Sequence, residues 1–321
     1  MKKRALFAAI LAVLLSVSFL SCTQSGTADK PYVAVIVKST ESDFFHRVRD
    51  GVESAAMEYN VRVTFEGPAN EEDYEAQNEM IRRAAENGAD VIVLSAIDYE
   101  QSSDTVNGVI RRGVRVITID SDISSDLVPL FIGTDNREAG KAAAAAAVRG
   151  FAEGGKIYIG IVNYRTETEN GREREAGFRA AVAEMENVRI VDVVTAESNE
   201  ASATEAALSL LSRYPHINVL VGLNEWMTLG VGNAIRKTGA THTRGVGFDA
   251  NLTSIAMLEG GEMDALLVQN PFAIGYLGVQ RAVTETAADN EKKKVYTAMT
   301  VVTRENLYDE DIQKLLFRFN G

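Results

Sequence analysis

Short apolar runs alternate with longer stretches of helical spacing along most of this chain. Five apolar runs precede residue 134 and five follow it: 32–37, 61–65, 91–95, 115–119 and 129–132, then 157–162, 188–194, 217–222, 244–248 and 264–268. Amphipathic segments lie between them, at 44–58, 72–87, 136–152, 172–185, 201–213, 226–237 and 272–288. Such alternation is typical of parallel strands that helices cover on both faces. The pattern predicts an α/β protein of two similar lobes, split near residue 134.

Helix-ending signals support this division into strands and helices. Gly88, Gly113 and Gly239 each follow a polar or basic helical end, where a left-handed residue commonly closes a helix. The alanine-rich stretch 141–148 predicts a tightly packed helix, because alanine is the strongest helix former. Only five prolines occur, and no proline-rich linker separates the two sets of strands. We therefore expect short crossing segments between the lobes.

The N-terminus has the pattern of an export signal. Three basic residues precede an apolar run over 5–20, which polar residues follow at once. The run ends in LSC and resembles a bacterial lipobox, which predicts a signal peptide over 1–21, lipidation of Cys22 and a flexible tether over 22–30. Cys22 is the only cysteine, so no internal disulfide can form. A simple signal peptide with a chance cysteine stays open as the alternative.

Composition and charge narrow the possible partners. The 321 residues are 46% hydrophobic and 24% charged, an ordinary globular composition with enough length for two domains. Removal of the signal would change the formal net charge from −12 to about −15. Such a surface repels nucleic acid and anionic lipid. We therefore expect no nucleic-acid partner, and an exported lipoprotein that acyl chains hold at the membrane, facing the periplasm or the cell exterior.

Three of the apolar runs end in an aspartate. In an open parallel sheet, ligands bind beyond the carboxyl ends of the strands. Asp135 precedes an alanine-rich helix, so we predict that it caps that helix. Asp120 and Asp249 end corresponding strands in different lobes, and we predict that both contact a ligand. A carboxylate can accept hydrogen bonds from two adjacent hydroxyls, the arrangement that sugars present.

Residues near the other strand ends have chemistry that suits a sugar. Phe44 and Phe45 would point about 100° apart on a helix, so we do not expect both in the same core; one or both would form an apolar wall. Arg172 lies at a helix start, where its donors would face the cleft. Asn224 and Gln269 each follow a strand and supply both a donor and an acceptor.

Other classes of protein fit this sequence less well. The segment DSDIS over 120–124 resembles the nucleophile loop of haloacid-dehalogenase phosphatases, but that loop usually opens its domain, and here three strands precede it. The three histidines have no spacing typical of a metal site, and no phosphate-binding glycine motif occurs. A sugar-responsive repressor would carry a basic helix-turn-helix where this chain has an export signal. We therefore predict a binding protein that is not an enzyme and needs no cofactor or metal.

Six segments carry a family resemblance through their order and spacing: STESDFFHRVRDGVESAA, VITIDSD, GREREAGFRAAV, NEWMTLGVGNAIRKTG, GVGFDAN and LVQNPFAIGYLGV. They resemble the ribose-binding-protein branch of the periplasmic binding proteins, which are the solute receptors of ABC importers. The resemblance implies a type I fold with two Rossmann-like lobes and a three-stranded hinge. It implies a first lobe of 31–134 plus 270–297 and a second lobe of 135–269 plus 298–321, with crossings near 134, 269 and 297.

The resemblance also implies which residues bind the ligand. These positions are Lys38, Ser42, Phe44, Phe45, Asp120, Ser121, Arg172, Asn224, Asp249 and Gln269, with Ser198 as a further candidate. Two of them depart from ribose binders, which carry arginine at position 121 and a small polar residue at position 38. Lys38 and the segment 65–77 are similar to the branch that includes autoinducer-2 and rhamnose receptors.

The resemblance implies a monomer that binds a pentose, a hexose or a related sugar and docks on an ABC permease. Two alternatives stay open for the function. One is an autoinducer-2 or rhamnose-type receptor of the same fold. The other is a sugar receptor that feeds a sensor kinase or a chemoreceptor, because transport and sensing both recognise the closed form.

Overall fold

The computed structural model describes residues 30–164, 167–285 and 293–317. The predicted signal peptide, Cys22 and all of the tether except Lys30 lie outside these residues. The described residues from Tyr32 onward form one compact unit. None of the helices that the structure describes is long and apolar enough to cross a bilayer.

The first lobe contains a six-stranded parallel sheet in the order β11-β5-β4-β3-β1-β2. Its strands are β1 (Tyr32–Ile36), β2 (Arg62–Glu66), β3 (Val91–Leu94), β4 (Arg115–Ile119), β5 (Leu130–Gly133) and β11 (Lys293–Tyr296). Its helices are α2 (Asp43–Glu58), α3 (Tyr74–Glu86), α4 (Ser103–Arg111) and α10 (Pro271–Thr284).

The second lobe repeats this strand order in a sheet β12-β10-β9-β8-β6-β7. Its strands are β6 (Ile157–Asn163), β7 (Val188–Thr195), β8 (Val219–Gly222), β9 (Arg244–Phe248), β10 (Ala265–Val268) and β12 (Thr300–Val302). Its helices are α5 (Asn136–Val148), α6 (Glu169–Val182), α7 (Glu200–Arg213), α8 (Glu225–Thr238), α9 (Leu252–Gly260) and α11 (Glu310–Leu316). One feature differs: β12 runs antiparallel to β10, whereas β11 runs parallel to β5.

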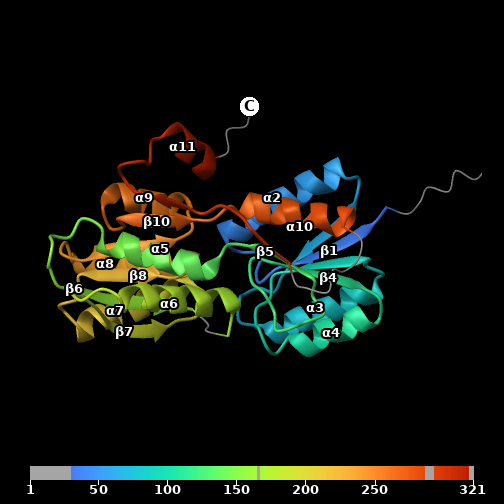
Figure 1. The fold of residues 1–321 in the computed structure, drawn as a ribbon, viewed down its shortest axis with the longest axis horizontal. Helices are drawn as coiled ribbons and strands as arrows, with labels where there is room; N and C mark the ends of the chain where they lie inside the picture. The colour runs from blue at the N-terminus through green and yellow to red at the C-terminus, as the bar shows by residue number, and fades with distance from the viewer. Residues whose placement is uncertain (1–29, 165–166, 286–292, 318–321) are drawn as a thin grey trace, which may run out of the picture. The chain divides into compact units, whose positions relative to one another are not determined.

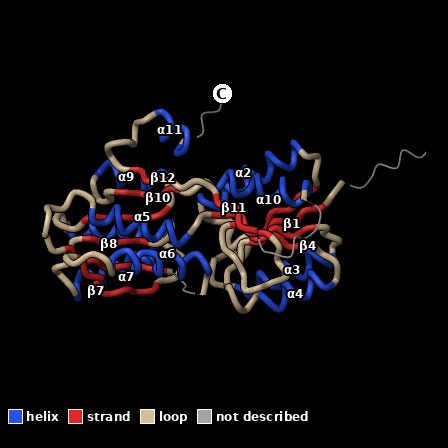
Figure 2. Tube along the Cα trace, viewed as in Figure 1, coloured by secondary structure: helices blue, strands red, loops and turns tan. Residues whose placement is uncertain are grey.

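The predicted α/β class with two parallel lobes is confirmed (Figure 2), and each of the ten apolar runs overlaps a strand. The chain passes between the sheets after β5, after β10 and between β11 and β12. The lobe boundaries and the three-stranded hinge stay predictions. The pattern missed β11 and β12, because neither is a continuous apolar run: β11 reads KKVY and is largely exposed.

Alternating side chains of β1 build two separate cores in the first lobe. Val33 and Val35 pack with the apolar faces of α2 and α10. Tyr32, Ala34 and Ile36 belong to the core beneath α3 and α4. Figure 1 shows α2 and α10 on one side of this sheet and α3 and α4 on the other. This two-sided burial is why the strands read as continuous apolar runs.

Both lobes contain helices in backbone contact, and glycine makes such contacts possible, as two of them show. A side chain at Gly51 of α2 would collide with the carbonyl oxygen of Phe272 in α10. A side chain at Gly140 of α5 would likewise collide with the carbonyl oxygen of Arg174 in α6. The alanine-rich helix is α5, and its buried alanines confirm the predicted tight packing. This contact fixes the position of α6 and of Arg174 on it.

Candidate ligand-binding site

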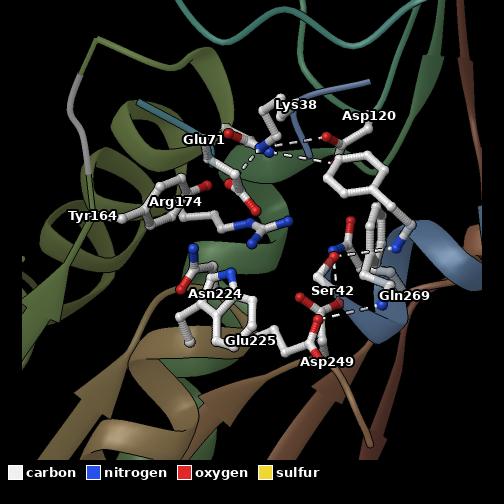
Figure 3. Close-up of a pocket in the computed structure, with 14 residues that line it drawn as sticks. Lys38, Ser42, Glu71, Asp120, Tyr164, Arg174, Asn224, Glu225, Asp249 and Gln269 are labelled. Atoms are coloured by element: carbon white, nitrogen blue, oxygen red, sulfur yellow. Dashed lines mark hydrogen bonds and ion pairs between the residues drawn. The ribbon is translucent and has the colours of Figure 1, made fainter. Parts of the chain in front are cut away.

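Side chains from both lobes line one cavity at the carboxyl ends of the strands (Figure 3). The first lobe supplies Lys38, Ser42, Phe44, Phe45, Glu71 and Asp120, and the second supplies Tyr164, Asn170, Arg174, Asn224, Glu225, Trp226, Asp249 and Gln269. Eight of the ten predicted site residues therefore lie together.

Asp120 and Asp249 share an uncommon backbone conformation at their strand ends. Their φ angles are 57° and 65°, in the left-handed region that aspartate tolerates better than most residues. Each backbone N–H donates to a carbonyl of the neighbouring strand, at 2.9 Å to Ile132 and 2.9 Å to Leu267. Neither caps a helix, since Asn251 caps α9, whereas Asp135 caps α5 as predicted. Both carboxylates line the cavity.

Lys38 lies between two carboxylates of its own lobe. Its ammonium nitrogen is 3.4 Å from Asp120 and 3.6 Å from Glu71. Burial would lower the pKa of Lys38, but the attraction of Asp120 and Glu71 is larger in sum and raises it. The Ser95 hydroxyl donates to Asp120 at 2.7 Å. Lys38 is therefore charged, and its ion-pair partners are side chains of the protein itself.

Asp249 depends on a residue at the crossing from β10 to α10. The Gln269 amide donates to Asp249 at 2.8 Å, and its carbonyl accepts the Thr134 hydroxyl at 2.7 Å. Burial raises the pKa of Asp249, while the nearby charge of Arg174 and the Gln269 bond act in the opposite direction. Gln269 thus joins the ligand site to Thr134, which follows β5 at another crossing.

The arginine in the cavity is Arg174, and the expectation for Arg172 needs correction. Arg172 is half-exposed, its guanidinium lies 4.4 Å from the centre of the Tyr99 ring, and it does not line the cavity. Arg174 is 1% exposed and donates to Asn136 at 3.0 Å and to the Leu223 carbonyl at 2.8 Å. Residues two apart on a helix point about 200° apart, so only one of the two can face the cavity.

Two buried polar atoms in the cavity have no hydrogen-bond partner among the described residues. They are Nη2 of Arg174 and the hydroxyl of Tyr164. Figure 3 shows the Arg174 guanidinium extending into the middle of the pocket. Burial raises the pKa of Tyr164 to about 12, so its hydroxyl keeps its proton and can donate. Unsatisfied buried donors cost about 1–3 kcal/mol each, which a ligand with acceptor oxygens would recover.

The expectation that Phe44 and Phe45 could not share a core is wrong. Both rings are buried in the core beneath α2 and α10, with centroids 5.1 Å apart and planes at 88°. Both also line the cavity, as an apolar wall requires. Two side chains that point in different directions can share one core, because the edge-to-face arrangement places the two rings nearly at right angles.

Ser42 and Asn224 combine helix capping with a place in the cavity wall. Ser42 accepts the Phe45 N–H at 3.2 Å, and Asn224 accepts the Met227 N–H at 2.9 Å. The hydroxyl proton of Ser42 and the amide nitrogen of Asn224 are donors that these capping bonds do not use. Ser121 and Ser198 are buried but do not line the cavity.

Six lining residues were not predicted as site residues: Glu71, Tyr164, Asn170, Arg174, Glu225 and Trp226. Tyr164 follows β6 directly, so the rule used for the strand-end residues could have found it. Glu225 follows the predicted Asn224, and Trp226 is the only tryptophan in the chain. The loop residue Glu71 gave no signal, because an exposed glutamate and a buried one look alike in sequence.

The described part of the chain contains no group of three or more His, Cys, Asp or Glu side chains that could hold a metal ion. The side chains that line the site offer hydrogen-bond donors, acceptors and aromatic faces.

A family model described as periplasmic binding protein domain matches residues 33–291. The chain belongs to this family. The resemblance and the type I fold inferred from the sequence are confirmed. The prediction that the protein is not an enzyme is confirmed as well, because its curated relatives are binding proteins.

Three similar proteins illustrate the family. The D-ribose/D-allose-binding protein of Pseudomonas aeruginosa is 25% identical over 291 residues, covering 88% of this chain and 90% of that protein. An ABC transporter solute-binding protein from Agrobacterium vitis, solved with bound D-fucose, is 27% identical, with a TM-score of 0.83 and coverage of 89% and 100%. A carbohydrate transporter solute-binding protein from Agrobacterium radiobacter, in complex with D-arabinose, is 24% identical, with a TM-score of 0.85 and coverage of 91% and 100%.

Proposed function

We propose that this protein binds one neutral monosaccharide between its lobes and presents it to an ABC permease. The single observation that carries this proposal is the pair of unpartnered buried donors, Arg174 Nη2 and the Tyr164 hydroxyl, in a cavity that both lobes line. Sugar hydroxyls both donate and accept, so they can satisfy these donors and the carboxylates of Asp120 and Asp249 together. The similar solute-binding protein from Agrobacterium vitis holds D-fucose, a sugar of the same class.

The charges of the cavity support a neutral ligand. Four carboxyl groups line it, against the two cations Lys38 and Arg174. Lys38 already has Asp120 and Glu71 as partners. An anionic ligand such as a sugar phosphate would lie close to these carboxyl groups in a desolvated site, where repulsion from those that are ionised is strong. A pentose, a hexose or a related sugar avoids that cost.

Binding would act by bringing the two lobes together. Asp120 and Lys38 belong to the first lobe, whereas Arg174, Asn224 and Asp249 belong to the second. A sugar that bonds to both groups favours the form in which both are close to it, and shifts the population toward that form. The permease would then recognise a surface that both lobes build. No covalent change occurs in the ligand.

Export and anchoring belong to the same proposal. The basic and apolar N-terminus with Cys22 would direct the chain out of the cell and attach it to a membrane through acyl chains. Mass spectrometry of the protein from membranes tests this, since Cys22→Ser should lose the lipid mass and release the protein. An unmodified Cys22 in the wild-type protein would contradict the anchor without affecting the binding proposal.

A thermal-shift screen on residues 23–321 tests the ligand class. The panel would hold pentoses, hexoses, deoxysugars, polyols, nucleosides, sugar phosphates and autoinducer-2. A ligand at a thousandfold excess over its Kd stabilises the folded state by about 4 kcal/mol, so a hit is easily seen. A shift with a neutral monosaccharide alone is the expected result. A shift with autoinducer-2 alone would keep the fold and change the ligand, and no shift at all would refute sugar binding.

Sensing is the second candidate function for the same site. A sensor kinase or a chemoreceptor would recognise the closed form just as a permease would, so the cavity does not distinguish the two. Growth on the sugar identified by the screen separates them. Loss of growth after deletion of the gene supports uptake, whereas normal growth with a lost transcriptional response supports sensing.

A further inference from the structure

Glu225 joins the two lobes at the edge of the cavity. It is the first residue of α8 in the second lobe and is 7% exposed. Its Oε2 accepts the backbone N–H of Phe44, in the first turn of α2 in the first lobe, at 3.2 Å. Its Oε1 accepts the side-chain amide of Asn251, which belongs to its own lobe, at 2.8 Å. Two donors, one from each lobe, therefore hold one carboxyl group.

The N-terminus of α2 has a free donor for this group. Ser42 caps α2 by accepting the Phe45 N–H, which leaves the Phe44 N–H without a partner inside the helix. The first turn of a helix carries a partial positive charge and favours an acceptor there. When the lobes separate, Glu225 must leave this turn, because the two ends of the bond belong to different lobes.

We propose that Glu225 is a positioning residue for lobe closure: it binds the first turn of α2 when the lobes close, and its carboxyl group takes up a proton in doing so. This inference rests on the proposed function for its link to sugar affinity. Closure itself can be measured without a sugar.

The environment of Glu225 explains the proton uptake. Burial raises its pKa to about 7, and the negative charges of Asp249, beyond β9, and of Asp43, in α2, add to the rise. The bonds from Asn251 and from the Phe44 N–H act in the opposite direction but are the smaller effect in sum. In separated lobes water reaches the carboxyl group, and its pKa returns toward the ordinary glutamate value of about 4.3.

The sign of the pH effect follows from these two states. The closed form holds the proton more tightly than the open form, so closure is favoured at low pH and weakens as pH rises through about 7. One such group makes binding about tenfold weaker at pH 8 than at pH 6. The pKa values of Glu71 and Asp249 are also raised by burial. The test therefore compares the pH dependence of binding between variants, because the wild type alone would not isolate Glu225.

The experiment compares the wild type with Glu225→Gln and with the control Glu53→Gln. Gln has nearly the shape of Glu but does not titrate, and Glu53 is an exposed residue on α2, the helix that Glu225 contacts. Each protein is titrated with D-ribose, D-allose and D-arabinose at pH 6, 7 and 8, with Trp226 fluorescence as the signal. Small-angle scattering gives the radius of gyration of each ligand-free protein at the same pH values, and circular dichroism checks the fold.

We expect the affinity of the wild type and of Glu53→Gln to fall from pH 6 to pH 8, and the fall for Glu225→Gln to be about tenfold smaller. Equal slopes for all three proteins would overturn the inference. If none of the three sugars binds, scattering decides: a wild type that is more compact at pH 6 than at pH 8, with no such change in Glu225→Gln, supports it. A wild type without that change overturns it.

Discussion

Asp120 and Asp249 occupy corresponding places in two sheets of the same strand order. Asp120 follows β4 and Asp249 follows β9. Each of these strands lies beside the strand after which the chain crosses to the other lobe, β5 or β10. Each aspartate has a positive φ and a backbone N–H bonded to the neighbouring strand. The two lobes thus present a carboxylate to the cavity by the same backbone geometry.

The side-chain surroundings of the two aspartates differ. Asp120 has a cation of its own lobe, Lys38, at 3.4 Å and a hydroxyl donor, Ser95. Asp249 has an amide, Gln269, and its pKa is raised because burial outweighs the charge of Arg174. Asp120 therefore neutralises the buried charge of Lys38, whereas the charge of the buried Asp249 is neutralised less completely. The same backbone position thus carries a carboxylate paired with a cation of its own lobe in one case, and a carboxylate held by an amide in the other.

The largest effect is expected from Asp120→Asn, which keeps the left-handed backbone but removes the charge next to Lys38. Breaking a buried ion pair typically costs about 3–5 kcal/mol. Glu71 stays 3.6 Å from the ammonium, so we expect the lower end of that range. Urea unfolding without sugar at pH 7.5 measures it.

Asp135→Asn is the matched control for this loss, because asparagine caps a helix as well as aspartate does. It also follows a strand, β5, and should change the stability by less than about 1 kcal/mol. A similar small change for Asp120→Asn would mean that Lys38 does not need its partner, and the contrast between the aspartates would disappear.

Asp249→Ala should leave the protein folded and remove most of its sugar affinity. A hydrogen bond to a charged group contributes about 1.5–3 kcal/mol, which corresponds to a loss of roughly 10–150-fold in affinity. Calorimetric titration with the sugar found in the screen measures the change. Because alanine at a positive φ adds strain of about 1–2 kcal/mol, Asp249→Asn serves as the companion variant that keeps the backbone. Near wild-type affinity in Asp249→Ala would remove Asp249 from the site.

Arg174→Lys and Arg172→Lys test which arginine belongs to the second lobe's side of the cavity. Lysine cannot reproduce the planar set of donors that bonds Asn136 and the Leu223 carbonyl, so we expect at least a tenfold loss of affinity for Arg174→Lys. Arg172 is half-exposed over Tyr99, and its variant should change affinity less than about twofold. The reverse ranking would restore the prediction made from the sequence.

The smallest effect is on thermal stability at different pH values. The change in Tm at pH 8 should have opposite signs in Asp249→Asn and Asp120→Asn. Because burial raises the pKa of Asp249, its folded form holds a proton more tightly than the unfolded chain. Its penalty is therefore absent at low pH and grows as pH rises above the ordinary aspartate pKa of about 4. Without ligand, Asp249→Asn should gain in Tm over the wild type as pH rises from 5 to 8, while Asp120→Asn should lose at pH 8. A parallel loss in both variants would show that Asp249 is compensated as well as Asp120.

The local pattern of apolar and polar residues predicted most of the fold, and with the family resemblance it predicted eight of the fourteen residues that line the cavity. The strands could be read because burial on both faces produces continuous apolar runs. Asp120, Asp249 and Asn224 could be found because a parallel sheet places its strand ends along one edge, and position along the chain gives the strand end. β11 and β12 escaped this reading, since short edge strands carry polar residues and lack an apolar run.

The sequence pattern could not predict how α6 is rotated about its own axis. A helix start at residue 172 was expected, whereas α6 begins at Glu169, capped by Thr168. The start of a helix does not fix which of its faces points inward, because that depends on how the helix packs. The backbone contact between α5 and α6 decides that Arg174 rather than Arg172 enters the cavity.

The sequence by itself determined the fold class, the two lobes and the strand-end positions, because each depends on neighbours within about ten residues. Only the tertiary structure decided which charges meet. Glu71 reaches Lys38, and Glu225 reaches the Phe44 N–H from 181 positions away in the chain. Such pairs leave no periodic signal, because their energy depends on the burial and on the partner that the folded lobes create.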